Sequence, residues 1–329
     1  MQLLVDDVAP GYQGTVPVLG APAATGDDPP PEPSLPWQPE LVHAFDLARP
    51  AMVRYAMALA RHWQVPLALT PATVRSLWPD QEFAEAACAA ADVLFALTQQ
   101  EAETFPVPTG RRNRIHIVPQ APSLSGVPNP ASVRALRERG PVVLFLGRRG
   151  RLKGYPELLD AAPLVWRTVP STTFVVAGPA WDDDIGGPPR ESHPPDPRFA
   201  DPRLVDLGMV DEQTKLDVLD ACDVLCLPSR ADAFPLVFVE AWTLGRAVVT
   251  GDFPGVAGVV RHEVDALVTA VSPEGVAESL IRLLTDHALR SRLAAAGYER
   301  AARCLTWEAV AEAVAAGYRE AIQLPRGAR

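Results

Sequence analysis

The chain has 329 residues, of which 48% are hydrophobic and 21% are charged, and its formal net charge is −10. This composition excludes a disordered or fibrous chain, because enough apolar residues are present to bury a sizeable core. The acidic balance argues against nucleic acid as the main partner and provides no general attraction to an anionic membrane surface.

The N-terminus carries no recognisable targeting signal. Residues 1–7 (MQLLVDD) lack the basic start and the long apolar core of a signal peptide. No run approaches the roughly 18 apolar residues that a membrane-spanning helix needs. The sequence therefore predicts a cytoplasmic protein without a transmembrane segment.

Short apolar runs alternate with helical patterns along most of the chain. This alternation predicts parallel sheets built from βαβ units. A first series of expected strands covers residues 41–44, 67–70, 93–97 and 115–118. A second series covers residues 142–146, 173–177, 204–207, 224–227, 247–250 and 266–268, and expected helices include 48–63, 155–167, 211–221 and 307–322.

The two series predict an α/β chain with two Rossmann-like parallel-sheet domains. Residues 1–130 are expected to form an abridged N-terminal domain, because the proline-rich residues 1–40 should form mainly loop. A second proline-rich loop is expected over residues 188–202. Residues 131–305 are expected to form a complete C-terminal domain, and residues 306–329 a last helix that packs elsewhere.

A basic, glycine-rich cluster occupies residues 147–154 (GRRGRLKG), between an expected strand and an expected helix. Ligands of open α/β sheets bind at the carboxyl ends of the strands, and helix N-termini favour anions. The cluster predicts a diphosphate site, and the alternative is a solvated basic loop. Lys153 favours the first interpretation, because only one other lysine, Lys215, occurs among the 30 basic residues.

A second cluster occupies residues 228–242 (PSRADAFPLVFVEAW), where a strand should end and a helix begin near Pro235. Glu240 lies in an otherwise apolar helix and therefore needs a partner. Its carboxylate is suited to accept hydrogen bonds from sugar hydroxyls, and Asp232 in the preceding loop is suited to a second sugar. The alternative is a structural ion pair between Glu240 and a nearby arginine.

Together the two clusters resemble the retaining glycosyltransferases of the GT-B fold, the glycosyl transferases group 1 type. Gly147 and Arg148, followed by Lys153, match the family's phosphate-binding segment. Asp232 and Glu240 match its paired acidic motif, with aspartate in place of the usual first glutamate. Further family landmarks follow in order at residues 174–178, 205–208, 221–224, 228–229, 245–249 and 307.

The resemblance implies a nucleotide-sugar donor site in the C-terminal domain. Glu240 would bind the ribose hydroxyls and Asp232 the hydroxyls of the transferred sugar, and both are candidate catalytic residues. The implied diphosphate contacts are Arg148, Lys153 and the main chain of Phe234, Pro235, Leu236 and Val237. The implied nucleotide contacts are Gly147, Gly208, Met209, Val210 and Glu240.

The resemblance also implies chemistry without a metal or another cofactor, because fixed cations and dipoles would stabilise the leaving group. The last helix would cross back onto the N-terminal domain. The acidic triplet at residues 182–184 resembles the metal-binding triplet of the other large glycosyltransferase fold, but it opens a glycine- and proline-rich loop. The four scattered cysteines lack zinc spacing and are expected to be buried thiols.

The N-terminal half departs from the family pattern. Family members commonly carry a histidine after the second strand, where this chain has residues 71–73 (PAT), and they commonly open with a glycine-rich loop. A usual glutamate is also replaced near residues 255–258 (GVAG). His43 is a candidate catalytic substitute, with a structural role as the alternative.

These features predict a retaining, metal-independent glycosyltransferase of the hexosyltransferase type. Its donor would be a nucleotide-diphosphate sugar, and its acceptor a growing polysaccharide, a lipid carrier or a small molecule. One alternative is a non-catalytic relative that binds a nucleotide sugar or a partner enzyme, and another is a nucleotide-sugar epimerase on the same fold. A thin N-terminal domain is also compatible with a homodimer.

Overall fold

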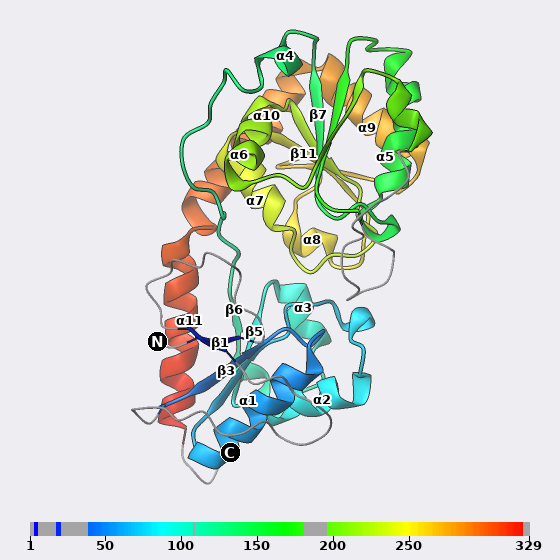
Figure 1. Ribbon diagram of the computed structural model, residues 1–329. Coiled ribbons are helices and arrows are strands. Elements are labelled where there is room, and N and C mark those ends of the chain that lie inside the picture. Colours follow the sequence, from blue (N-terminus) through cyan, green and yellow to red (C-terminus); the bar gives the residue numbers. More distant parts are fainter. Residues whose placement is uncertain (1–2, 6–17, 21–38, 108, 181–195, 325–329) are drawn as a thin grey trace. The chain divides into compact units, whose positions relative to one another are not determined.

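The computed structural model describes residues 3–5, 18–20, 39–107, 109–180 and 196–324 (Figure 1). The chain divides into two compact units. Unit 1 comprises Met1–Val118 and Ala311–Arg329, and unit 2 comprises Pro119–Val310. Each unit contains a parallel sheet of its own.

Unit 2 is built on a six-stranded parallel sheet in the order β12-β11-β10-β7-β8-β9. Its strands are β7 (Val142–Leu146), β8 (Thr173–Ala177), β9 (Leu204–Gly208), β10 (Val224–Leu227), β11 (Ala247–Gly251) and β12 (Leu267–Thr269). Every residue of β8, β10 and β11 is buried. A sheet covered on both faces explains why these strands read as nearly continuous apolar runs.

Helices cover both faces of this sheet (Figure 1). On one face α5 (Tyr155–Trp166) packs beside α9 (Pro273–Thr285). On the other face lie α6 (Glu212–Ala221), α7 (Leu236–Thr243) and α10 (His287–Cys304). Helices α7 and α10 approach closely because Gly297 faces the Trp242 indole, where a Cβ would lie 2.1 Å from the ring. Two short helices, α4 (Arg134–Arg137) and α8 (Val256–Val259), lie in connections.

Several helices of unit 2 begin at capping side chains. Asp211, Ser272 and Asp286 each accept a hydrogen bond from the backbone N–H three residues further along, at the starts of α6, α9 and α10. Such caps satisfy backbone donors that the first turn leaves without a helical partner. The local sequence therefore sets where these helices begin.

Unit 1 has a smaller main sheet of four parallel strands in the order β3-β4-β5-β6. These are β3 (Val42–Phe45), β4 (Leu67–Thr70), β5 (Val93–Ala96) and β6 (Ile115–Ile117). The connecting helices are α1 (Pro50–Trp63), α2 (Gln81–Ala90) and α3 (Gln99–Thr104). Two further strands, β1 (Leu3–Val5) and β2 (Val18–Gly20), form a separate parallel pair.

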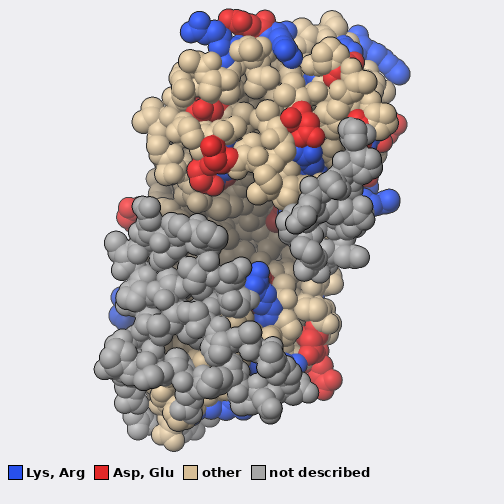
Figure 2. All heavy atoms as spheres, in the orientation of Figure 1, with Lys and Arg blue, Asp and Glu red and all other residues tan. Residues whose placement is uncertain are grey.

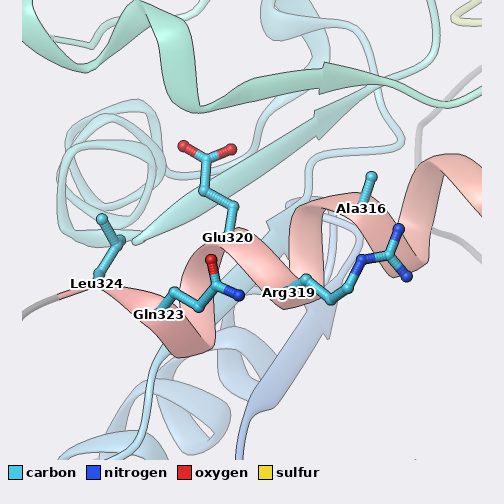
Figure 3. A pocket seen from close by; sticks show the side chains of 5 residues that line it. All are labelled: Ala316, Arg319, Glu320, Gln323 and Leu324. Atoms are coloured by element: carbon cyan, nitrogen blue, oxygen red, sulfur yellow. The ribbon is translucent and has the colours of Figure 1, made fainter.

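The last helix, α11 (Trp307–Gln323), supplies its residues from Ala311 onward to unit 1. It packs closely there because Gly317 faces the Phe95 ring of β5, where a Cβ would lie 2.5 Å from the ring. The Glu320 carboxylate lies 2.7 Å from Nε2 of His116 on β6. Figure 3 shows a shallow pocket on this helix, with Glu320 among the lining side chains and turned toward a strand.

The predicted α/β class with two parallel-sheet domains is confirmed. Each of the ten predicted strands overlaps an observed one, four of them with identical bounds and the others with ends that differ by one residue. The loop expected over residues 1–40 lies largely outside the described residues, and its described part contains β1 and β2. The described residues of this stretch include two strands of three residues each, and the expectation of mainly loop over the rest stays a prediction.

The boundary between the compact units lies after Val118, whereas the sequence predicts a domain boundary after residue 130. The connecting segment is held on unit 2 by its own hydrogen bonds. Lys215 Nζ donates to the Ser123 carbonyl at 2.9 Å, and Asp217 Oδ1 accepts from the Asn129 N–H at 2.7 Å. The prolines near residue 130 therefore mark a turn within unit 2.

On the face drawn in Figure 2, the acidic and basic side chains of the described residues are interspersed over unit 2. A nucleic-acid-binding surface needs an extended basic patch. The mixture of charges on this described surface does not form such a patch. None of the helices in the described part of the chain has both the length and the apolar character required to cross a membrane.

Candidate functional site

The two clusters that carry the chemical motifs meet at one edge of the unit 2 sheet. Strands β7 and β10 are hydrogen-bonded neighbours, with Val224 opposite Val143 and Leu225 opposite Leu144. From β7 the chain builds the sheet outward through β8 and β9, then returns to β10 and continues the other way. Ligands of open α/β sheets bind at the carboxyl ends of the strands where the strand order reverses in this manner.

The loops after β7 and β10 are locked together at this edge. Gly154 ends the first loop with a φ of 67°, in the left-handed region that favours glycine. A Cβ at Gly154 would lie 2.0 Å from the Pro228 carbonyl oxygen of the second loop. Arg230 then donates its N–H to the Leu152 carbonyl at 2.8 Å. The two loops therefore form one rigid rim.

Alanine at Gly154 is expected to destabilise unit 2 much more than alanine at Gly245. Both glycines have left-handed φ, 67° and 65°, so each substitution should cost about 1–3 kcal/mol in backbone strain. A Cβ at Gly245 meets nothing within 4 Å, whereas a Cβ at Gly154 overlaps the Pro228 carbonyl. Urea unfolding of both variants measures the difference, and equal losses of unfolding free energy would contradict the close packing of the two loops.

Lys153 and Asp232 form an ion pair across the two loops. Lys153 closes the short helical turn Arg151–Lys153 just before α5, and its ammonium hydrogen-bonds Oδ2 of Asp232. Only 15% of the Lys153 side chain and 11% of the Asp232 side chain are exposed. The predicted phosphate-binding lysine and the first acid of the predicted pair are therefore in direct contact.

Glu240 also has a partner, and that partner is a lysine instead of the arginine considered in the alternative interpretation. Lys215 of α6 donates from Nζ to Oε1 of Glu240 at 3.2 Å. The Glu240 side chain is only 5% exposed on the apolar helix α7. Burial raises the pKa of Glu240, and the Lys215 ammonium opposes that rise. The charge of Lys215 thus compensates the buried charge of the Glu240 carboxylate.

The remaining cations of the basic cluster are handled differently. Arg149 makes a bidentate ion pair with Asp206 in the middle of β9, so an acid neutralises one of the four clustered charges. Lys153 is neutralised by Asp232. The Arg148 side chain is exposed directly after β7 and follows Gly147. The structure thus places Gly147 and Arg148 at the same sheet edge as Lys153.

The start of α7 lies on the same rim. Phe234 and Pro235 are buried, and the helix begins at Leu236 with Val237 in its first turn. Pro235 offers no side-chain oxygen for capping, and the first turn contains no acidic residue to offset the positive end of the helix dipole. The main chain at this position therefore suits an anion.

The Gly208–Val210 segment follows β9, two strands from β7 in the sheet. The Gly208 carbonyl accepts from the Gly178 N–H at 2.7 Å, which ties the segment to the end of β8. Gly208 has a left-handed φ of 63°, and Met209 is 73% exposed. The structure thus brings an exposed apolar side chain to the same edge as the clusters after β7 and β10.

His43 lies in unit 1, where both of its ring nitrogens have a hydrogen-bonding partner. Its Nδ1 lies 2.7 Å from the Tyr318 hydroxyl, and its Nε2 lies 2.8 Å from Thr70 Oγ1. The ring stacks on Phe45, and burial lowers the pKa of His43 to about 3. A neutral ring with both nitrogens engaged fits a structural role, so the contacts of His43 argue against the catalytic assignment.

Among the described residues, no cluster of three or more His, Cys, Asp or Glu side chains is arranged to hold a metal ion. The acidic triplet at residues 182–184 lies outside the described residues. Three cysteines are buried, whereas Cys304 is exposed, so the expectation of four buried thiols was wrong at that position. Burial raises the pKa of Cys222 to about 12, which keeps this thiol protonated.

Lys215 is the residue that sequence reasoning missed. Its signal was present, because Lys153 and Lys215 are the only two lysines of the chain. The structure shows that each lysine holds one of the two acids that form the predicted acidic motif. Lysine is rare in this chain, and that rarity, which favoured a functional role for Lys153, applied equally to Lys215.

Comparisons with known proteins give a consistent result. The family model described as "Glycosyl transferases group 1" matches residues 131–300. The phosphatidyl-myo-inositol mannosyltransferase of Mycobacterium tuberculosis is 32% identical over 204 residues, which cover 60% of this chain and 52% of the relative. The chain thus spans about half the length of that curated relative.

Two further similarities cover more of the chain. The D-inositol 3-phosphate glycosyltransferase of Xylanimonas cellulosilytica is 33% identical over 288 residues, which cover 80% of this chain and 68% of the relative. The solved structure of Anabaena Alr3699/HepE in complex with UDP shares the fold with a TM-score of 0.66 at 18% identity, covering 84% of this chain and 78% of that one. The chain therefore belongs to the glycosyl transferases group 1 family.

Proposed function

We propose that the protein is a retaining, metal-independent glycosyltransferase that transfers a sugar from a nucleotide-diphosphate donor. The observation that carries this proposal is the contact of Lys153 with Asp232 beside β7 and β10. A cation suited to a diphosphate and a carboxylate suited to sugar hydroxyls share one rim there. Membership of the family and the UDP complex of the Anabaena neighbour support a nucleotide-sugar donor.

In this proposal each group has a distinct task. Lys153 and Arg148, with the main chain at the start of α7, stabilise the negative charge of the diphosphate leaving group. Glu240 accepts hydrogen bonds from the ribose hydroxyls, and Asp232 accepts them from the transferred sugar. The Gly208–Val210 segment contacts the base. These cations and main-chain donors would stabilise the charge of the diphosphate without a metal ion.

The test is release of the nucleoside diphosphate from a panel of nucleotide sugars with the full chain, in the presence of EDTA. The panel combines uridine, guanosine and adenosine diphosphate sugars with polysaccharide, lipid and small-molecule acceptors. Acceptor-dependent release that is insensitive to EDTA is expected for one donor. The anomeric configuration of the product, read by NMR, should match that of the donor, and inversion would refute the retaining mechanism.

A non-catalytic nucleotide-sugar binder is the second candidate, and a specific observation favours it. The segment after β4 is Pro71-Ala72-Thr73, without a histidine, and His43 on the neighbouring strand has both ring nitrogens engaged. Binding of a nucleotide sugar without release on any acceptor of the panel would support this candidate over the enzyme.

A further inference from the structure

Lys215 is the centre of a polar node outside the motifs of the family, in which Glu240 is buried, Lys215 is mostly buried and Glu212 is exposed. Its ammonium donates to the Ser123 carbonyl at 2.9 Å and to Oε1 of Glu240 at 3.2 Å, and pairs with Glu212 at 2.7 Å. Its side chain is 15% exposed, and that of Glu240 is 5% exposed. Three acceptors from three separate segments therefore converge on one ammonium group.

The ammonium group of lysine suits this node better than a guanidinium would. Its three rotatable donors can point toward three acceptors in different directions, whereas the donors of arginine form a planar fork. Almost all other basic residues of the chain are arginines. Lysine appears only where it contacts Asp232 or Glu240, which indicates that these two positions require its geometry.

The node also fixes the orientation of the Glu240 carboxylate. Oε1 accepts from Lys215, and the same ammonium is held in place by the Ser123 carbonyl. Glu240 projects from an apolar stretch of α7, so α7 itself offers little to hold the charge in place. Without Lys215 the buried carboxylate would lose its compensating charge and would tend to take up a proton or reorient.

We propose that Lys215 is a positioning residue that holds Glu240 ionised and oriented to accept hydrogen bonds from the ribose diol of the donor. The inference rests on the proposed function, because it takes the ligand of Glu240 to be a nucleotide ribose. Lys215 acts through Glu240 and does not contact the donor. Its loss should therefore affect recognition of the ribose and leave recognition of the diphosphate largely intact.

The experiment compares each nucleoside diphosphate with its 2′,3′-dideoxy analogue by calorimetric titration of the full chain. The wild type should prefer the ribose form by about tenfold or more, since hydrogen bonds to a charged group are among the stronger ones. In Lys215→Met this preference should fall to about twofold or less, because the carboxylate is no longer held in place. Affinity for the dideoxy analogue should change little.

Two matched variants separate positioning from general stability. Lys215→Arg restores the charge but not the geometry and should recover part of the ribose preference. Arg282→Met removes another ion-paired cation of unit 2, the partner of Glu263 on the exposed surface, and should leave the preference unchanged. If Lys215→Met does not fold, as judged by circular dichroism, Lys215→Gln replaces it with the same expectation.

The outcomes distinguish this inference from the proposed function. If the wild type binds no nucleoside diphosphate, the donor site itself is wrong. If the wild type binds and prefers ribose, but a folded Lys215→Met keeps the same preference, Lys215 has only a structural role and the inference is overturned. Loss of the preference with retained affinity for the dideoxy analogue supports it.

Discussion

Lys153→Met is expected to weaken binding of a nucleoside diphosphate by about 10- to 100-fold. A hydrogen bond to a charged group contributes about 1.5–3 kcal/mol, and each 1.4 kcal/mol changes the dissociation constant tenfold. The variant also leaves Asp232 without its cation in a mostly buried position, where its charge would repel the diphosphate. Calorimetric titration of the wild type and of Lys153→Met with the nucleoside diphosphate measures the two dissociation constants directly.

Arg167→Met is the matched control for this prediction. Arg167 is exposed and follows α5, at the opposite end of the helix from the loop that carries Lys153. Its loss also removes one positive charge from unit 2, but at a distance from the proposed diphosphate. Equal weakening in the two variants would mean that overall charge, and not a specific contact, controls the affinity.

Asp232→Asn is expected to change binding and turnover in opposite directions. The Asp232 carboxylate accepts a hydrogen bond from the Lys153 ammonium. A donor diphosphate must therefore compete with this carboxylate for Lys153. Removing its charge should raise the affinity for the nucleoside diphosphate about fivefold, which corresponds to roughly 1 kcal/mol. Release of the nucleotide from a nucleotide sugar should fall tenfold or more, because an acceptor for the sugar hydroxyls is weakened.

The rise in affinity and the fall in nucleotide release together distinguish this role of Asp232 from a purely structural ion pair. If the Lys153–Asp232 ion pair were purely structural, the Asp232→Asn variant would be less stable. It would also bind both the nucleoside diphosphate and the nucleotide sugar more weakly. Parallel weakening of the two ligands, with an unfolding midpoint lowered in step, would therefore contradict the assignment of Asp232 to the transferred sugar.

Much of the fold was predictable, because parallel strands that are buried on both faces are apolar along most of their length. The strand sequence Val142–Leu146 is an example, and its four buried residues leave little room for another interpretation. The meeting of the two clusters was predictable for the same reason. Loops that follow parallel strands lie at one edge of the sheet, so the positions of Lys153 and Asp232 after two such strands predict that both lie at the same edge.

The partners of the site residues were less accessible to sequence reasoning. Lys215 and Glu240 are separated by 25 positions and lie on different helices, so only the packing of α6 against α7 reveals their pairing. His43 is engaged by Tyr318, which is 275 positions away on α11. A histidine at the end of a strand looks the same in sequence whether a ligand or a distant side chain will occupy it.

The central claim is that the edge of unit 2 formed by the loops after β7 and β10 binds a nucleoside diphosphate without a metal ion. The most direct test is calorimetric titration of the wild-type chain with uridine, guanosine and adenosine diphosphates in the presence of EDTA. At least one of them is expected to bind with a dissociation constant below about 1 mM, within the usual range for substrates. Absence of binding by all three at millimolar concentration would contradict this claim.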